Sequence, residues 1–209
     1  MITLYGYPNT RSFRVLWALE ELNIEYQYQL THPLPDMQDA SFIQLNPSRK
    51  IPVIKHDNLV VSESAAILNY LADHFGTYPF IPTAGTGKRA TYDQWCYFML
   101  SELEQPLWTI AKHRFILPEA LRHPPVKDSV LWEFEQMTAC LATQLENNPF
   151  VTGEHFTPAD ILCTSTLMWA KMEKAPLTHD IFSTYLNKMM QRPAFQKANE
   201  IEAAQQLES

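Results

Sequence analysis

The stretch KIPVIKHDNLVVSESA at residues 50–65 decides the fold. It predicts a strand, a tight turn at 56–58, a second strand and the first residues of a helix. Because Pro52 cannot donate a hydrogen bond to a neighbouring strand, the first strand must begin there or be exposed there. Backbone groups beside Pro52 are then left to pair with a ligand, and a cis peptide bond is one way to present them.

The end of this stretch predicts a helix start that attracts a carboxylate. Glu63 and Ser64 open a segment, over 64–75, in which apolar residues recur at helical spacing. Free backbone N–H groups and a hydroxyl gather at such a start and favour an anion. Residues 50–65 therefore predict a binding site for a small peptide, with groups for its backbone and for its carboxylate.

The rest of the first 77 residues supplies the other parts of an α/β domain. In chain order the sequence predicts a strand over 2–5, a helix over 11–22, a strand over 25–30, an irregular segment over 31–35 and a short helix near 39–45. Together with the two strands and the helix of residues 50–75, these elements give the order βαβαββα. That order is typical of thioredoxin-like folds.

The second part of the chain carries no strand pattern. Glycine and proline are densest over 76–87, which predicts a linker over 78–87. Helical patterns follow over 92–115 and 126–146, and further helices begin at Pro158, Ile181 and Pro193. We therefore expect an α/β plus all-α protein, with a thioredoxin-like domain over 1–77 and an all-helical domain over 88–209.

One of these helices begins with a capping box. Thr157 is a favourable cap, Pro158 fits the first helical position, and Asp160 stands where an acidic side chain can reach back to the cap. The pattern assigns Asp160 a folding role rather than a catalytic one.

Composition excludes several classes of partner. The chain has 209 residues with 16 basic and 23 acidic side chains, a net charge of -7 and no basic run, which disfavours nucleic acid and anionic membranes. No apolar run approaches the roughly 20 residues needed to cross a bilayer, and no signal-peptide pattern opens the chain, so we expect a cytoplasmic protein. Cys96, Cys140 and Cys163 are far apart and odd in number, which favours buried thiols over a disulfide framework.

Ile51-Pro52-Val53 followed by SESAAI at 62–67 resembles the glutathione site of the cytosolic glutathione transferase family. The resemblance extends to 4–22, 46–48 and 156–161, and so covers essentially the whole chain. It implies a thioredoxin-like glutathione-binding domain, a helical domain, and a transferase that activates the glutathione thiolate for attack on a small apolar electrophile. It also implies a homodimer and no bound cofactor, because glutathione is consumed as a co-substrate.

The reaction needs a group that stabilises the thiolate, because a free thiol of pKa near 8.5 is mostly protonated at neutral pH. Lowering that pKa by roughly two units requires about 2.7 kcal/mol of preference for the anion, which a hydroxyl hydrogen bond and a helix amino terminus can supply. Thr10 stands four residues before Arg14, the spacing at which serine-type members of the family carry their activating hydroxyl. Its extra methyl keeps the donor but restricts the rotamer. Alternatively, Thr10 caps the helix; the other candidate donors are Asn9, Ser12, Tyr5 and Tyr7.

The family pattern implies further glutathione contacts residue by residue. Val53 would pair its backbone with the cysteinyl unit, as an added strand does. Glu63 would face the ammonium of the γ-glutamyl end, and Ser64 would hold its carboxylate. Lys50 would meet the glycyl carboxylate, although Arg49 stands where the family commonly has glycine before this lysine. The alternative is that both cations are solvated on the surface.

The helical domain would supply the electrophile pocket from a minority of its aromatic and soft apolar side chains. The candidates are Trp95, Tyr97, Phe98, Met99, Leu103, Trp108 and Phe115, most of which we expect in the core.

Other reactions fit the sequence less well. Cysteine-based disulfide exchange is excluded because residues 6–16 hold no cysteine, and metal-dependent hydrolysis because the histidines show no close pair at ligand spacing. Two alternatives stay open. One is reduction of peroxides by the same thiolate, and the other is a glutathione-binding or regulatory protein without catalysis.

Overall fold

A computed structural model describes residues 1–33, 36–76 and 80–208 of the chain. The chain forms two compact units. The first comprises Met1–Ile81 together with the residues from Met190 onward, and the second comprises Pro82–Met189. Parts of two predicted segments, the irregular one over 31–35 and the linker over 78–87, lie outside the described residues.

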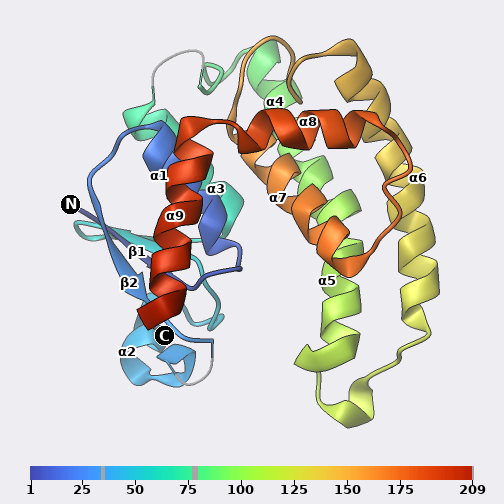
Figure 1. The fold of residues 1–209 in the computed structure, drawn as a ribbon. Coiled ribbons are helices and arrows are strands. Elements are labelled where there is room, and N and C mark those ends of the chain that lie inside the picture. Colours follow the sequence, from blue (N-terminus) through green and yellow to red (C-terminus); the bar gives the residue numbers. More distant parts are fainter. Residues whose placement is uncertain (34–35, 77–79, 209) are drawn as a thin grey trace. The chain divides into compact units, whose positions relative to one another are not determined.

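The first unit is built on a four-stranded mixed sheet (Figure 1). Its strands are β1 (Ile2–Gly6), β2 (Tyr26–Leu30), β3 (Val53–His56) and β4 (Leu59–Ser62), in the spatial order β2-β1-β3-β4. β1 pairs with β2 in parallel, and the other two pairings are antiparallel. The helices are α1 (Ser12–Glu21), α2 (Ala40–Leu45) and α3 (Ser64–Phe75). The predicted order βαβαββα is therefore confirmed, as is the thioredoxin-like fold class.

The apolar pattern explains how this sheet and its helices pack. Alternation along β1 buries Ile2 and Leu4 while the residues between them are half-buried. α1 follows β1 and leads into the parallel strand β2, as a crossover helix does, and its side chains Leu16 and Trp17 are fully buried. Ile67 and Leu71 of α3 are also fully buried. The core of the first unit thus lies between the sheet and its helices.

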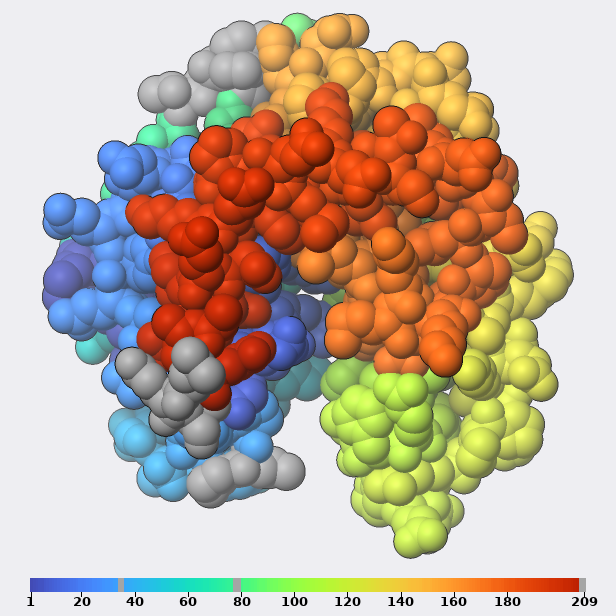
Figure 2. Space-filling model, viewed as in Figure 1, coloured from blue at the N-terminus to red at the C-terminus, as the bar shows by residue number. Residues whose placement is uncertain are grey.

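The last helix, α9 (Pro193–Glu208), packs on α1 in the first unit (Figure 1). The Phe195 ring meets the rings of Phe13 and Trp17 edge-on, with centroids 5.2 and 5.0 Å apart. Figure 2 shows the red carboxyl-terminal atoms directly against the blue atoms of the amino-terminal segments. The sequence-based division placed this helix in the helical domain over 88–209, whereas its aromatic and ionic partners lie on α1.

The second unit is entirely helical in its described residues, as expected. One helical run comprises α4 (Gly87–Phe98), a π-helical stretch (Met99–Glu104), α5 (Gln105–Ala111) and a second π-helical stretch (Lys112–Ile116). A short 3-10 turn (Glu119–Leu121) follows it. The remaining helices of this unit are α6 (Val126–Asn147), α7 (Pro158–Glu173) and α8 (Ile181–Met190). The run is longer than the predicted helix over 92–115. None of the helices that the structure describes combines the length and apolar character that crossing a bilayer requires.

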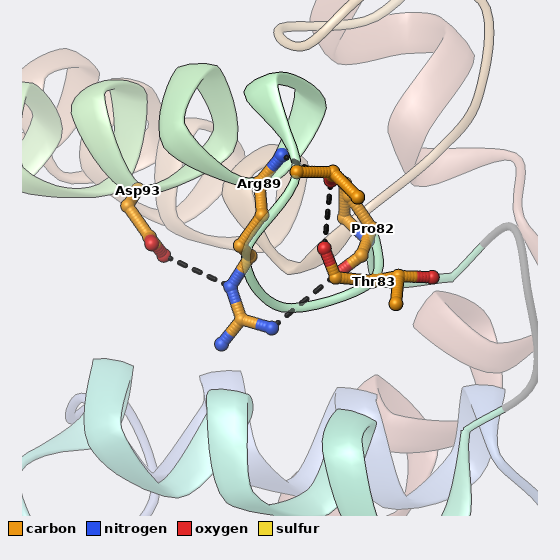
Figure 3. Close-up of polar contacts among 5 residues, drawn as sticks. Pro82, Thr83, Arg89 and Asp93 are labelled. Carbon is orange, nitrogen blue, oxygen red and sulfur yellow. Dashed lines mark hydrogen bonds and ion pairs between the residues drawn. The ribbon is translucent and has the colours of Figure 1, made fainter.

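Arg89 fixes the start of α4 to the segment before it (Figure 3). Its guanidinium donates to the Asp93 carboxylate one turn later, with an Nε to Oδ1 distance of 3.2 Å, and to the Pro82 carbonyl at 3.3 Å. Its backbone N–H donates to Oγ1 of the cap residue Thr86, and that hydroxyl donates to the Thr83 carbonyl at 2.7 Å. These bonds satisfy donors at the helix start that would otherwise lack partners.

The predicted capping box at the start of α7 is present. Asp160 is fully buried and accepts hydrogen bonds from the backbone N–H groups of Val151 and Thr157, at 2.9 and 2.8 Å, and from the Tyr185 hydroxyl at 2.8 Å. Burial raises the pKa of the Asp160 carboxyl, and these hydrogen bonds oppose that shift.

The three cysteines are free, but they are not all buried as the sequence predicted. Cys96 and Cys163 are buried, and burial raises the pKa of both thiols. Cys140 is exposed, because it lies outside the face of α6 that buries Phe134, Leu141 and Leu145.

Replacing Phe195 by alanine should lower the free energy of unfolding by about 3–5 kcal/mol, because it leaves a cavity beside Phe13 and Trp17. Urea denaturation followed by tryptophan fluorescence measures the change. Gln196→Ala, at the neighbouring exposed position, is the matched control and should stay within about 0.5 kcal/mol of the parent. Equal values for the two variants would contradict the packing of α9 on α1.

Asp160→Ala should cost about 3 kcal/mol or more, because the buried donors of Val151, Thr157 and Tyr185 lose their acceptor and each orphaned group costs about 1–3 kcal/mol. The same denaturation experiment measures it. Asp128→Ala, which removes an exposed carboxylate from the first turn of α6, should cost no more than about 1 kcal/mol. A loss at Asp160 as small as that at Asp128 would refute the role assigned to the box.

Candidate functional site

The register of the sheet brings the predicted site residues to one end of the first unit. Tyr5 of β1 stands opposite Val53 of β3, and Val53 stands opposite Ser62 of β4. Because β3 is antiparallel to both neighbours, its first residue lies beside the last residues of β1 and β4. The loop over 7–11, Val53 and the pair at 63–64 therefore lie at the same end of the strands.

The peptide bond between Ile51 and Pro52 is cis. Pro52 stands immediately before β3, so the strand begins there, which is one of the two positions that the sequence allowed. β3 itself lies inside the sheet rather than at its edge. The Val53 side chain is fully buried, so any contact of this residue with a ligand would have to be made through its backbone.

Ser64 is the first residue of α3 and lies above a buried cation. Ser64 is 5% exposed, and Nη1 of Arg14, which is 1% exposed, donates to its Oγ at 3.2 Å. A guanidinium and the amino terminus of a helix both favour an anion at this place. The preceding residue, Glu63, is exposed and has φ of 69°.

Arg14 was not among the site residues predicted from the sequence, where it served only to mark a spacing. One signal for it exists, because a charged residue interrupts the apolar run Phe13–Leu19 on a helix that packs against the sheet. A buried arginine needs a partner, and here one partner is the hydroxyl at the start of α3. The hydrogen bond ties the first turn of α1 to the first turn of α3.

Thr10 lies half-buried in the loop between β1 and α1. Its hydroxyl has two acceptors within reach, the Tyr7 carbonyl at 2.6 Å and Oγ of Ser12 at 2.9 Å. Its oxygen also accepts the Ser12 backbone N–H at 3.2 Å, so it serves the first helical residue although Arg11 holds the cap position. The single proton of this hydroxyl can turn from either acceptor toward a ligand.

The other candidate donors are held in different ways. Ser12 is fully buried, and a Cβ at Gly6 would lie 2.7 Å from its Cβ, so this hydroxyl sits in closely packed core. The Tyr7 ring lies against His32, with centroids 5.0 Å apart. Asn9 is exposed with φ of 59°, and its backbone N–H donates to Glu202 Oε2 at 3.1 Å. Of the hydroxyls on this loop, that of Thr10 combines partial exposure with a movable proton.

The two cations before β3 differ in their contacts. Arg49 has φ of 55°, in the left-handed region that glycine adopts readily, and its Nη1 donates to Gln38 Oε1 at 2.8 Å. Lys50 is exposed, and its carbonyl accepts from Nδ2 of Asn46 at 2.7 Å. The side chain of Arg49 is therefore engaged within the first unit.

The aromatic and soft apolar candidates for the electrophile pocket belong to the second unit. Met99 and Leu103 are fully buried and form core, whereas Tyr97 and Phe115 are 68% and 54% exposed. The half-buried members of the set are Trp95, Phe98 and Trp108. A pocket for a second substrate among them stays a prediction.

Among the described residues, no group of three or more histidine, cysteine, aspartate or glutamate side chains is placed to hold a metal ion. The candidate site itself presents hydroxyls, backbone groups and charged side chains.

Comparison with known proteins shows what this chain is similar to. Residues 1–73 match the family model described as glutathione S-transferase, N-terminal domain. Glutathione S-transferase GstB of Escherichia coli K12 is 29% identical over 171 residues, which cover 77% of this chain and 79% of that protein. Disulfide-bond oxidoreductase YfcG of the same organism is 25% identical over 203 residues, covering 93% and 92%.

A solved structure covers nearly the whole chain. The crystal structure of a glutathione transferase from Methylococcus capsulatus aligns with a TM-score of 0.86 and 25% identity, over 98% of this chain and 100% of that one. The family model matches the unit that carries the candidate site, and the alignment extends the similarity through the helical unit. Residues 1–73 thus match the glutathione S-transferase N-terminal domain, and the chain as a whole is similar to proteins of that family.

Proposed function

We propose that the protein is a glutathione transferase that binds glutathione in its first unit and activates the thiol for attack on an apolar electrophile. The observation that carries this proposal is the position of Ser64 at the start of α3, where its hydroxyl accepts a hydrogen bond from the buried guanidinium of Arg14. Ser64 lies at the same end of the sheet as Val53 and the loop that holds Thr10.

Each part of glutathione then has a counterpart. Ser64 and the backbone N–H groups at the start of α3 hold the γ-glutamyl carboxylate, and Glu63 pairs with the neighbouring ammonium. The backbone of Val53 pairs with the cysteinyl unit, and Lys50 meets the glycyl carboxylate. Binding at both ends of the tripeptide fixes the sulfur between them.

Thr10 is the group proposed to stabilise the thiolate. Its hydroxyl turns from the Tyr7 carbonyl to donate to sulfur, and the thiol proton leaves to solvent. A hydrogen bond to a charged group contributes about 1.5–3 kcal/mol, which matches the roughly two units by which the thiol pKa must fall. The thiolate then forms a carbon–sulfur bond with the electrophile, which loses a leaving group or takes up a proton.

A second candidate function uses the same thiolate against a different acceptor. The similarity to a protein named disulfide-bond oxidoreductase, over 93% of this chain, favours a glutathione-dependent redox reaction on a disulfide or a peroxide. That reaction needs no protein cysteine, because the sulfur of glutathione is the nucleophile. Parallel assays with a chlorinated nitrobenzene, cumene hydroperoxide and a glutathione mixed disulfide decide between the two. The homodimer and the cytoplasmic location stay predictions.

Thr10→Ala should raise the pKa of the bound glutathione thiol by about one unit or more and lower kcat/KM at least about tenfold, because one charge-assisted hydrogen bond is lost. Ultraviolet absorbance of the thiolate across pH measures the first effect. Thr10→Ser keeps the donor and should stay near the parent. An unchanged thiolate signal in Thr10→Ala would remove Thr10 from this role, and binding without any thiolate in the parent would favour a non-catalytic protein.

Ser64→Ala should weaken glutathione binding by about 10–100-fold, because a hydrogen bond to a charged carboxylate is worth about 1.5–3 kcal/mol. Isothermal calorimetry measures the Kd, and kcat at saturating glutathione should change much less. Ser183→Ala, at an exposed position of α8, is the control and should bind as the parent does. Equal affinities in the Ser64 variant and its control would contradict the placement of the carboxylate.

A further inference from the structure

Glu202 of α9 is in direct contact with the loop that carries Thr10. Its side chain is buried at 6% exposure, and its Oε2 accepts the backbone N–H of Asn9 at 3.1 Å. That N–H belongs to the peptide between Pro8 and Asn9, one residue before Thr10. Asn9 itself has φ of 59°, a conformation that is uncommon for residues other than glycine and that needs support from its surroundings.

The rest of α9 is anchored along α1, so the Glu202 carboxylate occupies a defined place. Arg192 forms a bidentate pair with Glu21, with distances of 2.6 and 2.8 Å, and Lys197 pairs with Glu20 at 2.6 Å. Phe195 contacts Phe13 and Trp17 of α1. Because the contacts run in opposite directions along the two helices, Glu202 arrives at the loop just before the first residue of α1.

Hydrogen bonds within the loop surround the candidate donor Thr10, one residue after the contact with Glu202. The Thr10 hydroxyl donates to the Tyr7 carbonyl, and the Tyr7 backbone N–H points to Ser12 Oγ at 3.4 Å. The loop that Glu202 contacts at Asn9 is thus the same short loop whose hydrogen bonds hold the Thr10 hydroxyl.

We infer that Glu202 is a positioning residue for Thr10, whose ionised carboxylate holds the loop in place and whose protonation releases it. This inference rests on the proposed function, since it concerns the group that would stabilise the thiolate. Glu202 does not touch the sulfur in this scheme and acts through the loop. The consequence is that activation of glutathione depends on the charge state of a side chain on the last helix.

The surroundings of Glu202 place its titration in the physiological range. Burial raises the pKa of its carboxyl to about 7, and the Asn9 N–H opposes that shift. Tyr28 of β2 faces it, and burial raises the pKa of that phenol as well, so Tyr28 stays neutral. Among the side chains that the structure describes, the other charged or titratable groups on the elements packed against Glu202 are Tyr7 and Arg11 on the loop, Arg14, Glu20 and Glu21 on α1, Tyr26 on β2, and Lys197 and Glu200 on α9 itself.

The sign of the pH effect follows from this raised pKa. Below pH 7 the carboxyl is neutral and accepts a weaker hydrogen bond, so the loop loosens and thiolate formation falls more steeply than ionisation of the thiol alone requires. Stability moves the other way, because a folded-state pKa above the ordinary value contributes stability that is complete at acid pH and is lost as the pH rises through 7. Glu202→Gln should therefore gain stability over the parent at pH 8 and not at pH 4.

The first experiment follows the amide of Asn9 by NMR in the protein without ligand. In the parent, its proton and nitrogen shifts should titrate with a midpoint near pH 7. In Glu202→Gln, which keeps an acceptor of the same shape, this step should vanish. Glu200→Gln, at an exposed position of the same helix, should leave it in place. A step that persists in Glu202→Gln would overturn the inference.

The second experiment measures the bound thiol across pH in a double-mutant cycle. Glu202→Ala should raise the pKa of bound glutathione by about half a unit or more, roughly a threefold loss of thiolate at neutral pH, with Kd changed less than about twofold. The same change in a Thr10→Ala background should have no effect, because Glu202 acts through Thr10. Glu202→Gln should lie between the parent and Glu202→Ala at pH 8, because it keeps an acceptor but lacks the charge. Urea denaturation of each variant confirms that it is folded.

The outcomes separate this inference from the proposed function. A parent protein that binds and ionises glutathione identically with and without Glu202 would refute the inference and leave the transferase proposal standing. A parent that does not bind glutathione would refute the transferase proposal, while the Asn9 titration would still decide whether Glu202 controls the loop. If Glu202→Ala changed the pKa of bound glutathione equally in the presence and absence of Thr10, Glu202 would act on stability and not on the direction of the Thr10 hydroxyl, which would refute the inference.

Discussion

The pairing of Val53 with Tyr5 on one side and with Ser62 on the other is the constraint on which the rest of the site depends. It aligns the end of β1, the beginning of β3 and the end of β4, and thereby gathers a loop, a strand start and a helix start. A shift of one residue in this register would turn the buried Val53 side chain outward and expose apolar surface. The geometry of the site is therefore fixed by burial in the sheet rather than by contacts among the site residues themselves.

Three of the buried charged residues, Arg14, Asp160 and Glu202, have roles in the fold or at the candidate site. Asp160 collects several donors in the helical unit and serves the fold alone. Arg14 and Glu202 each connect a helix to a segment at the candidate site. Burying a charge costs free energy unless the charge is paired or hydrogen-bonded. Such residues are therefore expected where the buried charge has a structural or functional role. In the first unit, Arg14 supplies a cation beside the start of α3, and Glu202 holds the loop before α1.

Local signals made much of the fold predictable. The helix over 64–75 was predicted with the bounds that the structure shows, because a polar start and an apolar repeat fall within a dozen residues. The proline before β3 and the capping box of α7 are likewise written in neighbouring positions. Thr10, Val53 and the Glu63–Ser64 pair were proposed from a motif, and the register explains how they come to share one edge.

Distant contacts were beyond the reach of the same reasoning. Glu202 lies 193 positions from Asn9, and the sequence around it, EIEAAQQLE, carries no clear apolar stripe that would show which side it buries. The grouping of α9 with the first unit depends on Phe195 meeting Phe13 and Trp17, and neither side of that contact is marked as a partner of the other. The exposure of Cys140 follows from the way α6 is turned, which a mixed helical pattern leaves undetermined.

Because α9 covers α1, the first unit is discontinuous in sequence and is completed late during synthesis. A ribosome that adds about 5–20 residues per second makes Phe195 on the order of ten seconds or more after Trp17. Throughout that interval the indole of Trp17, which is fully buried in the finished protein, lacks the ring that covers it. Until α9 has been made, the nascent chain thus carries on α1 an aromatic surface without the ring that packs against it.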